Sequence, residues 1–282
     1  RLKHMIPQSV RTPSAAGVFY PADPRQLQIL IRDLLSAIEA PHSIQGPIIG
    51  GIVPHAGYRY SGTVASQLYV SIHSLHPQRV ILIGPSHYQY FGYNAVYDGT
   101  VFSTPLGHLG VDQSFAEKLC QHPLMTLSSE GHGKEHAIEI QLPFLQEIYS
   151  HPYSIVPITM GNQRQETTKK LAHALLETWE SDQIVLASSD LSHFYEYQKA
   201  VAMDCRFYDL LVRADIESLW GALNCHEIEA CGFGPVMTLL QVAKSLGIGD
   251  IKILACGNSG DVTMDRNTVV GYLSALIYGV SE

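Results

Sequence analysis

The sequence predicts a single-domain α/β protein with a central, largely parallel or mixed sheet flanked by helices. Short apolar runs bounded by glycine and proline recur along the 282 residues, which is typical of buried strands. Amphipathic patterns of helical period lie between these runs, as connections between parallel strands require. The composition, 46% apolar and 16% charged, suits a large core, and no repeat or linker-like tract divides the chain.

The elements follow from these patterns in chain order. The first apolar run, Ile48 to Val53, stands between Gly46-Pro47 and Pro54, and Val64, Leu68 and Ile72 then share one helix face. Strands are expected at 48–53, 80–83, 155–158, 184–187, 251–255 and 269–278. Helices are expected at 63–75, 112–121, 136–149, 167–180, 197–212 and 235–246. The turn-rich stretch 88–110 indicates a large loop or an inserted hairpin.

Charge and cysteine usage exclude several classes of protein. The net charge is −8 and no Lys/Arg stripe is present, so nucleic acid is not an expected partner. No stretch approaches the roughly 20 apolar residues of a membrane span, and no apolar signal-peptide core is seen. Five scattered cysteines without a Cys-x-x-Cys pair favour a reducing, cytoplasmic setting. Residues 1–5 are interpreted as an expression remnant, and 6–282 as the folded domain.

Three predicted strands are each followed within a few residues by a histidine. His55 follows the first strand, His87 the second, and His193 the strand at 184–187. Ligands of open parallel sheets bind beyond the carboxyl ends of the strands, so the three side chains are expected at one edge. A lone histidine is more often structural, but three converging histidines favour a functional site. Imidazole suits Zn, Cu, Fe and Ni.

Cys231 is the candidate for an anionic third ligand beside two histidines. It lies in Glu229-Ala-Cys-Gly-Phe-Gly-Pro235, directly before a predicted helix. A helix N-terminus lowers the pKa of a thiol and favours the metal-binding thiolate. The alternative is a small buried hydrophobic residue, which free cysteine often is.

Two further pairs carry titratable groups. His136 and Glu139, preceded by Glu135, are three positions apart and would be neighbours on a helix face; the alternative is a solvated helix start. Asp190 and His193 fit an oriented acid/base pair, or alternatively Asp190 caps a helix and His193 is merely exposed.

Taken together, these motifs resemble the Memo family, called AmmeMemoRadiSam system protein B in bacteria and archaea. The resemblance runs from Ala16-Gly-x-Phe-Tyr20 to the last apolar strand, and five motifs carry it. They are Pro54-His-Ala-Gly-Tyr58 with Ser61-Gly62, Gly84-Pro-Ser-His87, Glu135-His-x-x-Glu139-x-x-Leu142-Pro143, Ser188-Ser-Asp190-x-x-His193 and Cys231-Gly232. It implies a fold similar to class III extradiol dioxygenases, with His55, His87 and Cys231 as metal ligands. Asp190 and His193 would line the same pocket as catalytic residues, and Glu135 and His136 are further pocket candidates.

The resemblance leaves the activity open. A Cys in place of the dioxygenase carboxylate softens the site toward copper, zinc or thiolate-ligated iron, so catechol cleavage is an analogy of fold only. The favoured hypothesis is a non-haem oxidoreductase that uses Fe(II) or copper on a small-molecule substrate, with a radical enzyme as a pathway partner. One alternative is a non-catalytic binding module for a peptide or small molecule, although Arg59 is the only basic candidate near His55. Another is a zinc hydrolase.

Overall fold

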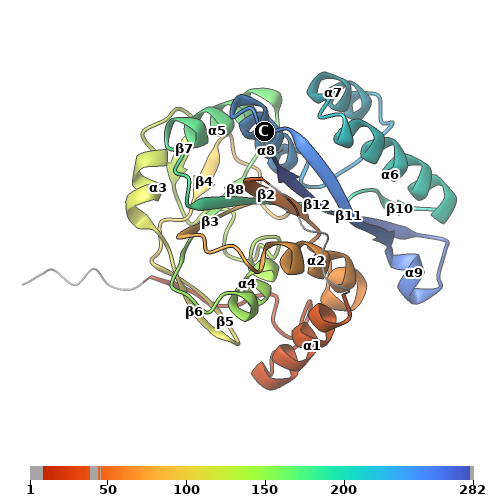
Figure 1. The fold of residues 1–282 in the computed structure, drawn as a ribbon, viewed down its shortest axis with the longest axis horizontal. Coiled ribbons are helices and arrows are strands. Elements are labelled where there is room, and N and C mark those ends of the chain that lie inside the picture. The colour runs from red at the N-terminus through yellow and green to blue at the C-terminus, as the bar shows by residue number, and fades with distance from the viewer. Residues whose placement is uncertain (1–8, 39–43, 45, 280–282) are drawn as a thin grey trace, which may run out of the picture.

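A mixed sheet of nine strands runs through the molecule (Figure 1). The computed structural model describes residues 9–38, 44 and 46–279. The interpretation of residues 1–5 therefore falls outside the described part of the chain. Along the sheet the strand order is β10-β12-β2-β9-β3-β8-β4-β7, and β11 also pairs with β12.

Four adjacent parallel strands form the middle of this sheet. They are β2 (Ile48–Val53), β9 (Gln183–Ser188), β3 (Arg79–Pro85) and β8 (Ser154–Met160). Their side chains are almost all buried, because helices cover both faces. Gly50 allows close pairing of β2 with β9, since a Cβ there would lie 1.9 Å from the Val185 carbonyl oxygen.

The strands on either side make the sheet mixed, as predicted. Those on the β2 side are β12 (Val269–Tyr278), β11 (Asp250–Asn258) and β10 (His193–Tyr195), each paired antiparallel. Those on the β8 side are β4 (Asn94–Val96), antiparallel to β8, and β7 (Met125–Leu127), parallel to β4. A separate three-stranded sheet contains β1 (Val10–Arg11), β5 (Val101–Thr104) and β6 (Gly107–Gly110).

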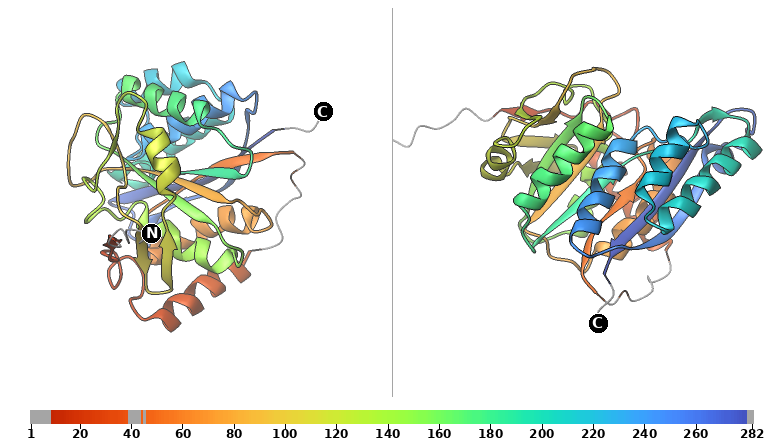
Figure 2. Two further views of the ribbon diagram at one scale, coloured as in Figure 1. Left: turned by 90° about the vertical axis from the view of Figure 1, so that its left-hand side faces the viewer. Right: turned by 90° about the horizontal axis from the view of Figure 1, so that it is seen from above.

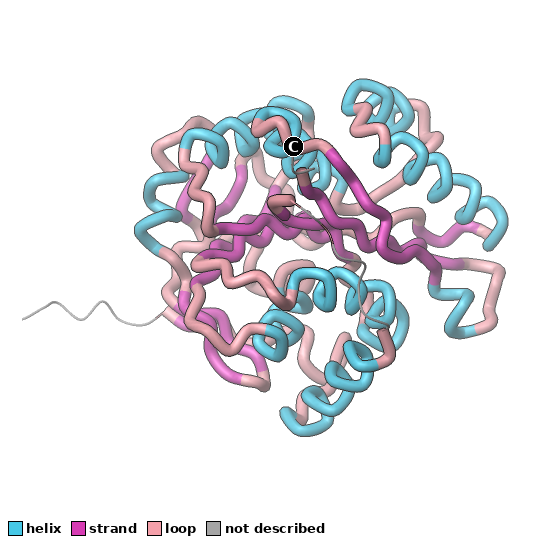
Figure 3. The backbone as a smooth tube through the Cα atoms, viewed as in Figure 1, coloured by secondary structure: helices cyan, strands magenta, loops and turns pink. Residues whose placement is uncertain are grey.

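Helices lie on both faces of the sheet and enclose two hydrophobic cores (Figures 1 and 3). The helices of one face are α1 (Pro24–Ser36), α2 (Tyr58–Ile72) and α4 (Leu142–Ile148). Those of the other face are α3 (Gln113–Leu119), α5 (Gln165–Glu177), α6 (Tyr197–Val212), α7 (Ile216–Asn224) and α8 (Phe233–Ser245). Figure 2 shows α5, α8, α7 and α6 side by side, in this order, across the second face. The short helix α9 (Ser259–Thr263) joins β11 to β12.

The structure corrects one predicted helix. The segment 136–149 is not one helix but a turn, a 3-10 helix (Glu139–Gln141) and α4. Pro143 in the first turn of α4 fits a helix start but not a helix interior. His136 and Glu139 therefore do not share a helix face, and that prediction is wrong. The stretch 88–110 contains the β5–β6 hairpin, in agreement with one of its two interpretations.

Candidate metal centre

His55 lies two residues beyond β2, at the carboxyl edge of the parallel strands, and its ring is fixed by Ser188. His55 Nδ1 is 2.8 Å from Ser188 Oγ, and the Ser188 hydroxyl donates its proton to the Ala137 carbonyl at 2.7 Å. A hydroxyl has only one proton, so Nδ1 of His55 must be the donor to Ser188. The lone pair of His55 is then on Nε2. Burial and neighbouring histidines lower the pKa of His55 well below its usual value, which keeps the ring neutral.

His87, two residues beyond β3, is oriented in the same sense by Glu135. Its Nδ1 donates to Glu135 Oε1 at 2.9 Å, and its backbone N–H donates to Oε2 at 2.7 Å. Burial tends to raise the Glu135 pKa, but hydrogen bonds and the charge of His87 outweigh it and lower this pKa overall. An ionised carboxylate only accepts, so His87 also carries its lone pair on Nε2. A carboxylate behind an imidazole is the usual support of a metal-ligating histidine.

His136 brings a third imidazole to the same place. Its ring stacks on His87 with centroids 4.9 Å apart and on Phe19 at 4.2 Å, and it lies 5.4 Å from the ring of His55. Burial lowers its pKa to about 4, so the ring is neutral at physiological pH. Its buried Nδ1 makes no hydrogen bond among the described residues, and Glu135 Oε1 lies 3.5 Å from it. A neutral imidazole with an unused ring nitrogen fits a ligand role.

Donor atoms of His55, His87 and His136 all lie within 4.8 Å of one another. Cys231 lies beside them, with Sγ 3.1 Å from His55 Nε2. The donor set therefore fits a metal ion: two imidazoles have fixed Nε2 lone pairs, and both a third imidazole and a thiol are close. Sequence reasoning placed His136 in the pocket without assigning it to the ion, and the geometry makes it as strong a third donor as Cys231.

Cys231 directly precedes α8, as predicted, but its thiol is not activated in the way expected. Burial, reinforced by the Asp190 carboxylate, raises the pKa of Cys231 well above its usual value. The expectation that the helix start lowers this pKa is wrong, because removal from water outweighs the helix dipole. Gly232 is required next to it, since a Cβ there would lie 2.1 Å from the Ser188 carbonyl oxygen. Without an ion, Cys231 is a neutral thiol.

Asp190 and His193 have separate partners. Asp190 Oδ1 accepts the His55 backbone N–H at 2.8 Å, and burial raises the pKa of this carboxyl to about 6. His193 begins β10, and its Nδ1 lies 3.5 Å from Glu229 Oε1. Within the described residues no hydrogen bond joins Asp190 to His193, and no helix begins at Asp190 for it to cap. Glu229, rather than Asp190, is placed to orient His193.

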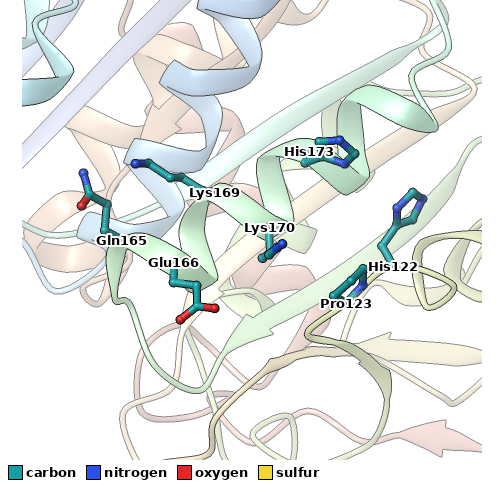
Figure 4. Close-up of a pocket in the computed structure, with 7 residues that line it drawn as sticks. All are labelled: His122, Pro123, Gln165, Glu166, Lys169, Lys170 and His173. Carbon is teal, nitrogen blue, oxygen red and sulfur yellow. The ribbon is translucent and has the colours of Figure 1, made fainter.

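A cavity of about 460 Å³ opens beside this cluster. His136, Asp190 and His193 line it, so three of the predicted pocket residues share one space. A second cavity, of about 550 Å³, lies at the start of α5 (Figure 4). There His122 and His173 approach with ring centroids 6.2 Å apart, but the charged side chains are exposed and none of the predicted site residues takes part. The first cavity is therefore the candidate substrate site.

A buried ion pair anchors the N-terminal segment beside the centre, and sequence reasoning missed it. Arg11 donates to Glu139 Oε2 at 2.6 Å and to the Glu135 carbonyl at 2.6 Å. The Glu139 carboxylate also accepts from backbone N–H groups of Ser14 and Ala15. This network holds the segment that carries Phe19 against His136. Glu139 is thus a support of the pocket wall.

Ser188 and Gln141 are two further supports that sequence reasoning left without a role. Gln141 Nε2 donates to Ser188 Oγ at 3.0 Å and to the Pro54 carbonyl at 3.0 Å, which ties the His55 loop to the end of β9. Ser188 is the last residue of β9, so its strand-end position was the available signal. Nothing in the local sequence pointed to Gln141.

The fold and the donor cluster define an α/β protein with a histidine-rich, metal-type site at the edge of its sheet. Residues 11–276 match the Memo family, described as Memo-like protein. The chain is 35% identical to a MEMO1 family protein of Sulfolobus acidocaldarius, covering 94% of this chain and 98% of that one. It is also 35% identical to a MEMO1 family protein of Methanobrevibacter smithii, covering 95% and 99%. This chain belongs to the Memo family.

The fold is also seen in a solved structure of low sequence identity. The crystal structure of an uncharacterized protein from Escherichia coli K12 superposes with a TM-score of 0.53 at 13% identity, covering 82% of this chain and 99% of that one. Over the described parts of the present chain, no helix is both long and apolar enough to cross a membrane.

Glu135→Gln is expected to weaken metal binding by roughly 10- to 100-fold, as the loss of a supporting carboxylate commonly does. Glu135 accepts four N–H groups, from His87 Nδ1 and three backbone amides, and a glutamine has only one acceptor oxygen to offer them. Competition with a chromophoric chelator measures the affinity. Glu130→Gln, in the same loop but bonded to Tyr93 instead of a histidine, is the control. Equal affinities for the two variants would contradict this role.

Metal affinity is expected to rise with pH, because binding releases protons from the ligands. The number of protons released shows whether Cys231 or His136 is the third ligand. Burial tends to lower the pKa of His87, but Glu135 outweighs it and raises this pKa above the usual value; the pKa values of His55 and His136 are lowered. His87 must therefore release a proton on binding near and below its pKa, while the other two imidazoles are already neutral. Cys231, if it binds, releases one more proton throughout pH 6–8, since its pKa is raised.

Calorimetry of Zn(II) binding in buffers of different ionisation enthalpy measures this release. Wild-type protein should release about one proton more than Cys231→Ala at pH 8 if the thiol is a ligand. Equal release would assign the third position to His136. An affinity independent of pH between 6 and 8 would contradict both assignments.

Proposed function

We propose that this protein is a metal-dependent oxidoreductase that holds iron or copper with His55 and His87 and a third donor from His136 or Cys231. One observation carries the proposal: three imidazoles have donor atoms within 4.8 Å of one another, and this cluster borders a cavity large enough for a small substrate. Ser188 and Glu135 aim the Nε2 lone pairs of His55 and His87, which supports ion binding over a purely structural role.

The ion would supply one-electron chemistry and an affinity for O₂, which protein side chains lack. The residues of the chain do the rest. Ser188 and Glu135 keep His55 and His87 in the tautomers that bind, and Asp190 fixes the backbone of His55. With Nδ1 of His193 facing Glu229, its Nε2 is the atom that would exchange a proton with a substrate in the cavity.

Softness of the donor set favours iron or copper over a hard ion. Mg²⁺ and Ca²⁺ prefer oxygen ligands, so a site of three imidazoles and a thiol does not suit them. Zinc would also bind these donors, so the presence of an ion alone does not separate redox chemistry from hydrolysis.

Elemental analysis of protein purified with and without oxygen, followed by reconstitution with Fe(II), Cu(I) or Zn(II), tests the proposal. Near-stoichiometric iron or copper, together with oxygen consumption or a reversible metal redox change, is the expected result. His73→Ala is a matched control, because His73 is exposed and bonds only to the Val70 carbonyl. Zinc alone without redox activity would overturn the redox assignment in favour of a hydrolase. If the protein takes up no ion, the result would favour the alternative of a non-catalytic binding module.

A further inference from the structure

The cavity beside the histidine cluster combines aromatic walls with negative charge. Its aromatic lining residues are Phe19, Tyr60, Phe194 and Tyr272. Its charged lining residues are Asp190 and Asp265, and no lysine or arginine lines it. Neither carboxylate forms an ion pair with a lysine or arginine among the residues that the structure describes. The space therefore has two carboxylates without a lysine or arginine partner and four aromatic rings.

Two arginines close in sequence to lining residues stack on tyrosine rings, and one of these rings, Tyr60, lines the cavity. Arg59 lies over Tyr60 at 5.9 Å, and Arg266 lies over Tyr197 at 4.6 Å. Neither guanidinium lines the cavity. Glu229, next to His193, adds a further carboxylate at the edge of the lining. An anionic ligand would thus meet carboxylates and find no lining cation to pair with.

Phe194, which lines the cavity, has a strained backbone conformation. Its φ is +62°, a left-handed conformation that disfavours a residue with a Cβ, and its side chain is 74% exposed. Strain of this kind persists where the surrounding structure imposes it, and it clusters at binding sites. The exposed ring belongs to a residue that lines the cavity, so a ligand there can contact it.

We propose that this cavity binds a small organic ammonium cation with an apolar or aromatic body. Aromatic faces attract ammonium groups through their ring quadrupole, and the carboxylates of Asp190 and Asp265 add Coulomb attraction. A volume of about 460 Å³ suits a small molecule. The inference deepens the proposed function, because it names the substrate class of the same site, but it is tested on metal-free protein.

The test uses three probes that share a phenyl ring and differ in charge: 2-phenylethylamine, 2-phenylethanol and phenylacetate. Each is titrated by calorimetry into metal-free protein at low salt. The amine is expected to bind about tenfold more tightly than the anion, with a difference that shrinks as salt is added. Asp265→Asn should weaken amine binding about two- to fivefold, as expected for an exposed carboxylate, and leave the alcohol unchanged. Phe194→Ala should weaken binding of all three probes, and binding of the amine most, because it removes a ring face that attracts the ammonium group.

Asp250→Asn is the matched control, since it removes one exposed carboxylate at the start of β11, outside the cavity lining. It should leave the preference for the amine unchanged. Equal binding of amine and anion, equal effects of Asp265→Asn and Asp250→Asn, or no saturable binding of the amine would each overturn the proposal. Failure of the protein to bind a metal would overturn the redox function instead, because these titrations contain no metal.

Discussion

Replacing Glu139 by glutamine is expected to lower the free energy of unfolding by about 3–5 kcal/mol, because it leaves the buried Arg11 guanidinium without its counter-charge. The two side chains are 5% and 0% exposed, so water cannot compensate for the lost partner. Glutamine also turns one acceptor of Glu139 into a donor that faces the N–H group of either Ser14 or Ala15. Urea denaturation measures the loss.

Glu147→Gln is the matched control for this substitution. Glu147 pairs with Arg32, whose side chain is 62% exposed, and surface pairs contribute no more than about 1 kcal/mol. Similar losses for the two variants would contradict the account of a buried anchor.

The pH dependence of the Glu139 effect has a definite sign. Burial tends to raise the pKa of Glu139, but Arg11 and the hydrogen bonds around it outweigh this and lower it overall. A lowered folded-state pKa gives stability that is present above the unfolded value of about 4.3 and is lost as pH falls through the folded-state pKa. The difference in free energy of unfolding between wild type and Glu139→Gln should therefore be largest at pH 7 and smaller at pH 3.

Replacing His55 by alanine is expected to weaken binding of Fe(II), Cu(I) or Zn(II) by more than about 100-fold, beyond the loss from a supporting residue. His55 joins the imidazole cluster to Cys231, because its Nε2 lies 3.1 Å from the Cys231 Sγ. The variant should remain folded, because its backbone bond to Asp190 does not depend on the side chain. Chelator competition gives the affinity, and His73→Ala again serves as control. An affinity within about threefold of wild type would remove His55 from the metal site.

Much of the sheet could be predicted because its central strands are buried on both faces. A parallel strand covered by helices must be apolar throughout, so its run stands out against turn residues, as in 48–53 and 184–187. The strand-end positions of His55, His87 and His193 followed from the same pattern. By contrast, α1 and α7 were missed, and β10 is only three residues long.

The partners of the site residues could not be predicted, because they come from distant parts of the chain. Glu139 was read as a helix neighbour of His136, yet its carboxylate is bound by Arg11, 128 residues away. Cys231 was expected to ionise at a helix start, but burial dominates its pKa. His136 lies in a turn whose backbone N–H groups donate to the Glu135 carboxylate. The spacing of residues on a helix does not predict such a turn.

The proposed function depends on a metal ion bound between His55 and His87. Anomalous diffraction from crystals of protein reconstituted with Fe(II) or Cu(I), recorded above and below the absorption edge, tests it most directly. We expect one strong peak at roughly 2.0–2.3 Å from Nε2 of both histidines, with His136 or Cys231 as the third ligand. A peak elsewhere, or none in fully loaded crystals, would contradict it.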